Sequence, residues 1–164
     1  MKILGIIDED FINYKKASMV IEFPYCSFKC DKECGKPVCQ NGILANEPVI
    51  EIDAKKIVER YLQNPITEAI VFQGLEPFDS CEDMYDLIIE IRRRTDDDIV
   101  IYTGYSYREI YRYTDKLSHI FQNIIIKYGR YIPDVEPHYD PVLGVNLASD
   151  NQYAEKISWQ MIIK

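Results

Sequence analysis

The feature that most constrains the fold is an alternation of short apolar runs with segments of helical periodicity. Runs typical of buried strands are predicted at residues 2–7, 19–23, 68–72, 99–102, 123–127 and 157–163. Segments typical of helices are predicted between them, at residues 54–64, 80–94 and 106–116. Strands that alternate with helices form βαβ crossovers, so the sequence predicts an α/β protein with a mostly parallel sheet.

Two of the predicted helices carry start signals. Asp53 is a suitable N-cap for the first helix. Ser80, followed three residues later by Asp83, resembles a capping box for the second helix. Four apolar residues of this second helix recur at i, i+3, i+4 and i+7, which predicts one buried face: Met84, Leu87, Ile88 and Ile91.

The length of 164 residues limits the size of the sheet. A complete (βα)8 barrel takes about 250 residues. The chain is therefore predicted to form a partial (βα) barrel or an open sheet, as a single domain over residues 1–164 with its cofactor loop after an early strand. Residues 128–151 contain three prolines and two glycines and are predicted to be irregular. We expect the segment 129–152 to be either a disordered tail or a lid over the open side of the sheet.

Charge and hydropathy exclude two classes of protein. The net charge is −8, and a nucleic-acid-binding protein would need a basic surface. No apolar run approaches the roughly 18 residues that cross a bilayer, and the first residues lack the features of a signal peptide. We therefore expect a cytoplasmic protein that binds neither nucleic acid nor membrane.

The cysteines are crowded into one loop directly after the second predicted strand. Four of the five lie within fourteen consecutive residues: Cys26, Cys30, Cys34 and Cys39. The residues between them are largely charged, so this loop cannot be a buried core segment. In a reducing compartment such a cluster of thiols indicates metal or redox chemistry. The fifth, Cys81, stands alone and is expected to be a small buried hydrophobe.

The spacing of these thiols favours an iron–sulfur cluster over zinc. Structural zinc sites usually close with four ligands on two CxxC-type knuckles, whereas three, three and four residues separate the cysteines here. Iron–sulfur clusters accept thiolates from one winding loop. If only three cysteines bind, one iron stays open to a substrate, which is the logic of a catalytic site.

Two further segments are predicted at the same edge of the sheet. Gly74-Leu75-Glu76-Pro77 follows one strand and Thr103-Gly104 follows the next. Ligands of parallel sheets bind at the carboxyl ends of the strands, so we expect both segments to face the cysteine loop. Glycine permits close approach of another molecule, and Glu76 before a proline is expected to point its carboxylate outward, suited to an ammonium group.

Five segments together resemble the radical S-adenosylmethionine (SAM) enzymes, in particular the small activating enzymes of anaerobic ribonucleotide reductase. They are Cys26-Ser27-Phe28-Lys29-Cys30 with Cys39-Gln40-Asn41, Gln73-Gly74-Leu75-Glu76-Pro77, Ile101-Tyr102-Thr103-Gly104-Tyr105, Gly129-Arg130-Tyr131-Ile132 and Ser149-Asp150-Asn151-Gln152. The first is similar to the CxxxCxxC motif of that family, and the second to its Gly-Gly-Glu-Pro element, which binds the methionyl amino group.

The resemblance implies a set of ligands. It assigns a [4Fe–4S] cluster to Cys26, Cys30 and Cys39, with Cys34 as the alternative to Cys39. It assigns SAM contacts to the following residues: Val38, Gly74, Leu75, Glu76, Thr103 and Gly104. The family separates its second and third cysteines by two residues, whereas eight separate Cys30 from Cys39, so residues 31–38 are interpreted as an enlarged loop.

The resemblance also implies an activity. The reduced cluster would cleave SAM to a 5′-deoxyadenosyl radical, which in the activating enzymes removes hydrogen from a glycine of a partner enzyme, anaerobic ribonucleotide reductase being the example. A flavodoxin or ferredoxin would supply the electron, oxygen would have to be excluded, and the segment 129–152 would act as a lid. The activating enzymes usually carry an Asp-Gly-x-Gly-x-Arg segment before the first strand, and residues 13–18 do not provide it. A radical enzyme that modifies a peptide or small molecule, and a non-catalytic zinc or iron–sulfur module, are the alternatives.

Overall fold

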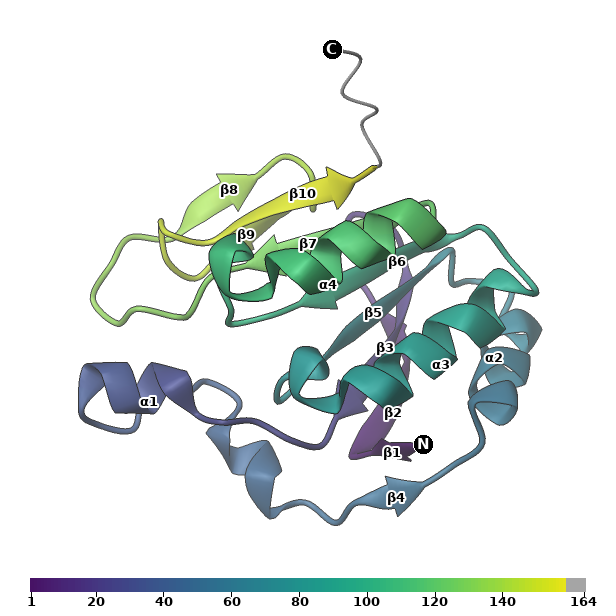
Figure 1. Ribbon diagram of the computed structural model, residues 1–164, viewed down its shortest axis with the longest axis horizontal. Helices are drawn as coiled ribbons and strands as arrows, with labels where there is room; N and C mark the ends of the chain where they lie inside the picture. The colour runs from purple at the N-terminus through teal and green to yellow at the C-terminus, as the bar shows by residue number, and fades with distance from the viewer. Residues whose placement is uncertain (159–164) are drawn as a thin grey trace.

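The computed structural model describes residues 1–158 and has a mixed α/β fold around one six-stranded sheet (Figure 1). Its strands, in the order in which they pair, are β10 (Tyr153–Ile157), β7 (Ile124–Tyr128), β6 (Asp98–Tyr102), β5 (Ala69–Gly74), β3 (Ser18–Phe23) and β2 (Gly5–Asp10). The four inner strands run parallel, and β10 and β2 pair antiparallel at the two edges. The predicted α/β class with a mostly parallel sheet is confirmed, whereas closure into a partial barrel stays a prediction.

Three long helices cover one face of this sheet (Figure 1). They are α2 (Ala54–Gln63), α3 (Cys81–Arg92) and α4 (Tyr107–Ile120), all within a few residues of the predicted ranges. The shorter elements are α1 (Lys29–Cys34), the 3-10 helices η1 (Gly42–Asn46) and η2 (Pro77–Ser80), and the paired strands β1 (Lys2–Ile3) and β4 (Ile50–Glu51). No helix in the part of the chain described is both long and apolar enough to cross a membrane.

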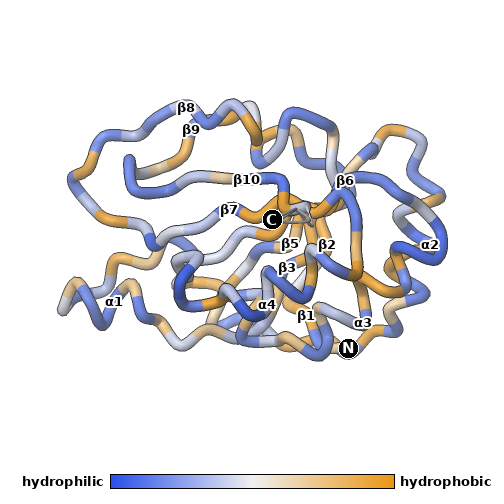
Figure 2. The backbone as a smooth tube through the Cα atoms, turned by 45° about the horizontal axis from the view of Figure 1, so that its top comes forward, coloured by the Kyte–Doolittle hydropathy of each residue, from blue (hydrophilic) through white to orange (hydrophobic). Residues whose placement is uncertain are grey.

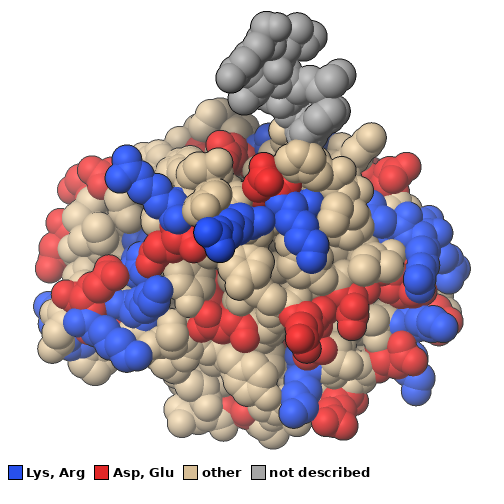
Figure 3. All heavy atoms as spheres, viewed as in Figure 1, with Lys and Arg blue, Asp and Glu red and all other residues tan. Residues whose placement is uncertain are grey.

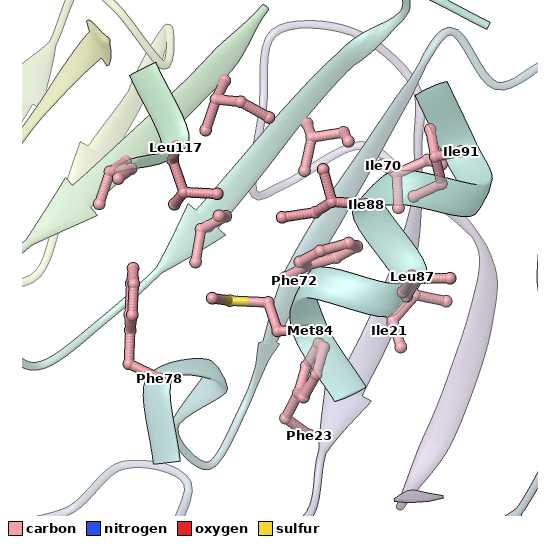
Figure 4. Close-up of a cluster of buried hydrophobic side chains, with 14 of the residues drawn as sticks. Ile21, Phe23, Ile70, Phe72, Phe78, Met84, Leu87, Ile88, Ile91 and Leu117 are labelled. Carbon is pink, nitrogen blue, oxygen red and sulfur yellow. The ribbon is translucent and has the colours of Figure 1, made fainter. Parts of the chain in front are cut away.

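The main core lies between the sheet and these helices. Figure 4 shows Phe23 and Phe72 from two neighbouring strands beside Met84 of α3. The two phenylalanine rings lie 5.3 Å apart between centroids, and the predicted apolar face of α3 is buried against the sheet. Figure 2 shows the hydrophobic residues concentrated along the strands in the middle of the molecule. Such apolar burial supplies most of the stability of a domain and gives the strand ends a rigid base.

The opposite face of the sheet is covered by the segment that the sequence predicts to be irregular. It contains two short paired strands, β8 (His138–Asp140) and β9 (Val145–Leu147). Leu143 and Leu147 pack there against Val20, Val71 and Val100. The Asp140 carboxylate accepts hydrogen bonds from the backbone N–H groups of residues 142, 143 and 154, which ties this hairpin to β10.

Two further sequence predictions concern the start of α3 and the last strand. The capping box at Ser80 is wrong, because the Ser80 hydroxyl makes no hydrogen bond and Asp83 accepts the backbone N–H of Lys2 instead. The last strand is predicted at residues 157–163, of which 159–163 lie outside the described residues; the last strand described, β10, covers Tyr153–Ile157. β10 is an edge strand with exposed polar side chains, so it lacks the continuous apolar run of a buried strand.

Candidate functional site

A cavity of about 330 Å³ lies at the carboxyl ends of the parallel strands. Segments that follow β3, β5, β6 and β7 all contribute to its wall, and the C-terminal segment closes one side. In Figure 1 the chain that carries α1 extends from this end of the sheet. The residues that line the cavity include Cys26, Cys30, Cys39, Asn41, Gly74, Leu75, Glu76, Thr103, Gly104, Lys127, Gly129, Leu147 and Gln152.

Three of the four loop thiols share this cavity. Cys26, Cys30 and Cys39 line it, and all three are half-buried. Cys34 does not line it but lies in a neighbouring cavity of about 370 Å³, at the end of α1. Of the two alternatives that the sequence left open for the third ligand, the structure brings Cys39 beside the strand ends and leaves Cys34 outside.

Asp31 closes the enlarged loop between Cys30 and Cys39. Its carboxylate oxygen Oδ1 accepts hydrogen bonds from the backbone N–H of Val38, at 2.7 Å, and of Cys39, at 2.8 Å. Asp31, the residue after Cys30, is therefore bonded to the backbone of Cys39. The intervening chain forms α1 and a turn at Gly35, outside the cavity. This contact explains how Cys39 can reach the site despite its distance along the sequence.

A second hydrogen-bonded network fixes the first cysteine. The Asp79 carboxylate in η2 accepts the backbone N–H of Ser27 at 2.7 Å and the hydroxyl of Tyr105 at 2.6 Å. The hydroxyls of Ser27 and Tyr105 lie 3.3 Å apart. The loop at Cys26 is thus attached both to the segment after β5 and to the segment after β6.

Glu76 joins the ends of β5 and β6 inside the site. Its carboxylate accepts hydrogen bonds from the Thr103 hydroxyl at 2.8 Å, the Gly104 N–H at 2.9 Å and the Phe78 N–H at 3.1 Å. The residue is only 4% exposed, so the outward-pointing carboxylate expected from the sequence is wrong. Burial raises the pKa of Glu76 to about 7, although these three donors oppose the shift.

Gly74 is required by the sheet itself. Its φ is +96°, and a Cβ at this position would lie 2.7 Å from the backbone nitrogen of Phe23 in the adjacent strand. The Gly74 carbonyl accepts a hydrogen bond from the Asn41 side-chain amide at 2.8 Å. The sequence analysis attributed this glycine to the approach of a ligand, whereas the close contact is with β3, and Asn41 connects the cysteine loop to the same point.

We expect Gly74→Ala to destabilise the protein much more than Gly35→Ala. Both glycines have positive φ, which costs a non-glycine residue about 1–3 kcal/mol, but no atom lies within 4 Å of a Cβ built at Gly35. At Gly74 the forced shift of β3 adds roughly a further 1–3 kcal/mol. Urea unfolding of the two variants measures this difference, and equal losses of free energy would show that the contact with β3 is unimportant.

Lys127 places a buried positive charge in the cavity wall. It is 7% exposed at the end of β7, and its ammonium group donates a hydrogen bond to the Gly129 carbonyl at 2.9 Å. Burial lowers the pKa of Lys127 to about 8, against the opposing effect of the nearby Glu76 carboxylate. A lysine inside an otherwise apolar strand is a signal that the sequence analysis passed over.

The two C-terminal segments quoted in the resemblance are bonded to one another. The Gln152 amide donates to the carbonyl of Gly129, and the Asn151 amide donates to the carbonyl of Arg130. The Gln152 side-chain oxygen accepts the backbone N–H groups of Ala148 and Ser149. These contacts hold one wall of the cavity against the end of β7.

An ion-pair network holds α1 beside the site. Arg130 donates two hydrogen bonds to Glu109, at 2.9 and 2.6 Å, and its Nε lies 3.3 Å from Glu33 of α1. The Lys29 ammonium donates to Glu109 at 3.2 Å and lies 4.5 Å from the centroid of the Tyr105 ring. The hydrogen bonds from Arg130 hold the pKa of Glu109 well below its usual range.

The three half-buried thiols that line the cavity fit an iron–sulfur cluster. Within residues 1–158 no three Cys, His, Asp or Glu side chains converge on one metal position. The thiolates of a [4Fe–4S] cluster each bind a separate iron, so three thiols around a shared cavity fit it. Burial raises the pKa of Cys26 to about 11 and also raises that of Cys30, so loading with iron must release protons.

Most residues assigned from the sequence meet in this cavity. Gly74, Leu75, Glu76, Thr103 and Gly104 line it together with the three cysteines. Val38 does not line it, and its backbone N–H is bonded to Asp31. The positioning contacts of Asp31, Asp79 and Tyr105 were not predicted. Asp79 has partners far away in the sequence, among them Tyr105, and Asp31 is one of several charged residues in its loop. Cys81 is half-buried, and its thiol donates to the Phe78 carbonyl at 2.8 Å.

Comparison with known proteins agrees with this chemistry. Searches of curated proteins and of solved structures gave no match. Residues 17–144 match a family described as the 4Fe-4S single cluster domain. The match covers more than half of the chain and includes the cysteine loop and the ends of β3, β5, β6 and β7. The chain therefore belongs to the 4Fe-4S single cluster domain family.

Proposed function

We propose that this protein is a radical SAM enzyme of the activating type. One observation carries the proposal: three thiols of the cysteine loop share a cavity with Gly74, Glu76, Thr103 and Gly104, from the ends of two neighbouring parallel strands. A non-catalytic module would need only the thiols. The pairing order β3-β5-β6-β7 is also the order that a partial (βα) barrel requires, and we include that architecture in the proposal.

Cys26, Cys30 and Cys39 would hold the [4Fe–4S] cluster. With three protein thiolates, one iron of the cluster would be left without a protein ligand and open to a substrate. When bound and reduced, the cluster supplies the electron that cleaves SAM to a 5′-deoxyadenosyl radical. The protein contributes orientation and the exclusion of water, because the cofactors carry the chemistry.

The charged groups of the cavity suit the two ends of a methionyl group. The Lys127 ammonium can face a carboxylate, since it makes one hydrogen bond and has three donors. The Glu76 carboxylate keeps acceptor capacity beyond its three bonds and can face an ammonium group. Each is buried, so each would gain from an opposite charge that is brought beside it.

The proposed target is a glycine in a glycyl radical enzyme such as anaerobic ribonucleotide reductase, and the proposed reductant is a flavodoxin or ferredoxin. This part rests on the resemblance of the strand ends and the C-terminal segments. Residues 13–18 do not provide the glycine-rich segment of the activating enzymes, so modification of a peptide or small molecule is the second candidate.

Anaerobic reconstitution tests the proposal. We expect a brown protein with about four irons per chain, an EPR signal of the reduced cluster that changes when SAM is added, and formation of 5′-deoxyadenosine. A cluster whose EPR spectrum does not respond to SAM, with no cleavage product, would refute the enzyme and leave an iron–sulfur binding module. Stoichiometric zinc without colour would refute the cluster as well.

We expect Lys127→Met to weaken SAM binding about tenfold, because it removes one charge-assisted hydrogen bond at a buried position. The measurement is SAM titration of the reconstituted protein, followed by EPR, with iron content determined in parallel. Lys55→Met on the exposed surface of α2 is the matched control and should bind SAM as the unsubstituted protein does. Equal affinities of the two variants would exclude Lys127 from the SAM site.

A further inference from the structure

A second and larger cavity, of about 1080 Å³, lies beside the proposed SAM site without sharing a residue with it. We call it the acidic groove. It runs between the paired strands β1 and β4 on one side and η2 with the starts of α2 and α3 on the other. Its acidic lining residues are Glu51, Asp53, Asp79, Glu82, Asp83 and Asp86.

The charge of this groove is strongly one-sided. Six of its lining side chains are carboxylates, whereas its positive groups are the Lys2 side chain and the Met1 ammonium, which donates to the Ile52 carbonyl at 2.9 Å. None of these six forms an ion pair with another of the described residues 1–158. Figure 3 shows acidic side chains gathered over the start of α3 on this face. The N-termini of α2 and α3 each offset only about half a unit of this negative charge. A cleft lined by one sign of charge concentrates the electric field inside it.

Ser80 adds an unsatisfied polar group to the same groove. The residue is 9% exposed, and its hydroxyl oxygen is buried without a hydrogen-bond partner. Buried polar atoms are nearly always paired, so a hydroxyl without a protein partner in a groove wall is one with which a bound group can pair. A hydroxyl can donate to a peptide carbonyl or accept from a peptide N–H.

The composition of the groove fits a polypeptide better than a small cation. Tyr25 and Tyr113 are 44% and 43% exposed along it, and Phe78 contributes apolar surface. Exposed aromatic rings are common where proteins recognise chains, and they also attract lysine and arginine. The carboxylates are spread along the groove, and no three acidic, histidine or cysteine side chains in residues 1–158 converge to hold a metal ion.

We infer that the acidic groove binds a basic, extended segment of a partner polypeptide. The groove lies next to the cysteine loop, since Tyr25 precedes Cys26 and Asp79 accepts the N–H of Ser27. A segment bound there would hold its protein beside the mouth of the proposed SAM site. The inference does not depend on radical chemistry, because it rests on the charge, size and orphan hydroxyl of the groove.

Peptide binding to the full chain tests the inference. The probe is a fluorescent twelve-residue peptide of alternating lysine and tyrosine, compared with a peptide in which glutamate replaces lysine. We expect the basic peptide alone to bind, with an affinity that falls as salt rises. In Glu82→Gln with Asp86→Asn we expect binding about tenfold weaker, because two carboxylates of the groove lose their charge.

The control variant removes two negative charges from the surface outside the acidic groove. Glu59→Gln with Glu136→Gln changes two exposed carboxylates outside the groove and should alter affinity by less than about twofold. Ser80→Ala should weaken binding of the basic peptide at high salt, where charge alone no longer contributes. Equal losses in both double variants would mean attraction to the net charge only and would overturn the inference, as would absence of binding. Competition by magnesium or calcium alone at low concentration would assign the groove to a cation instead.

Failure of the inference can be told apart from failure of the proposed function. The groove variants lie outside the SAM site, so their SAM cleavage should equal that of the unsubstituted protein. Loss of peptide binding with normal cleavage supports the groove as a separate docking surface. Normal peptide binding in a protein that does not cleave SAM would refute the enzyme and leave the groove standing.

Discussion

Cys39→Ala is expected to abolish assembly of the [4Fe–4S] cluster, whereas Cys34→Ala is expected to leave it unchanged. Cys39 lines the cavity with Cys26 and Cys30, while Cys34 lies in the neighbouring cavity at the end of α1. Without Cys39 the cluster would keep only two protein thiolates, and no other described thiol at the cavity can replace the lost ligand. Iron and sulfide content, visible absorbance and EPR after anaerobic reconstitution measure the result.

Cys34→Ala also serves as the folding control for Cys39→Ala. Both remove one half-buried thiol from the same loop, so a general loss of folding would affect both. Circular dichroism of the metal-free proteins separates misfolding from loss of a ligand. A cluster that survives in Cys39→Ala but not in Cys34→Ala would assign the third ligand to Cys34 and contradict the geometry of the cavity. Loss in both would indicate four thiolate ligands and no open iron.

The architecture could be read from the sequence because its signals are local. The apolar face of α3, at Met84, Leu87, Ile88 and Ile91, is visible as a helical repeat and is buried in the structure. The parallel strands appear as continuous apolar runs because both of their faces are covered. Edge strand β10 and hairpin β8–β9 lack such runs and could not be predicted in this way. Hydrogen bonds such as those that Asp140 accepts from residues 142, 143 and 154 stabilise them instead.

The site was predictable in its members but not in its connections. Parallel strands bring their carboxyl ends together, so Gly74, Glu76 and Thr103 could be expected to meet. The hydrogen bond from Thr103 to Glu76 spans 27 residues, and no sequence pattern encodes such a pair. Lys127 was readable in principle, since a charge within a buried strand requires an explanation.

In the enlarged cysteine loop the cysteines could be predicted from the sequence, but the contact that brings Cys39 to the site could not. An extended chain of eight residues would keep Cys30 and Cys39 too far apart to act as neighbouring ligands. The structure removes the excess by folding it into α1 and bonding Asp31 to the backbone of Val38 and Cys39. Asp31 is one of several charged residues in the loop, so its role follows from the geometry alone. It fixes the backbone of Cys39, the proposed third ligand.

Asp31→Ala is therefore expected to lower the affinity for the cluster about 10- to 100-fold, the usual effect of losing a contact that orients a metal ligand. Asp31→Asn keeps an acceptor for the N–H groups of Val38 and Cys39 and should recover most of this loss. The measurement is the rate at which a chelator removes iron from the reconstituted protein, with Lys32→Ala as a neighbouring surface control. If alanine and asparagine at position 31 behave alike, charge rather than position is responsible. If neither differs from aspartate, the hydrogen bonds to Val38 and Cys39 do not set the position of the third thiol.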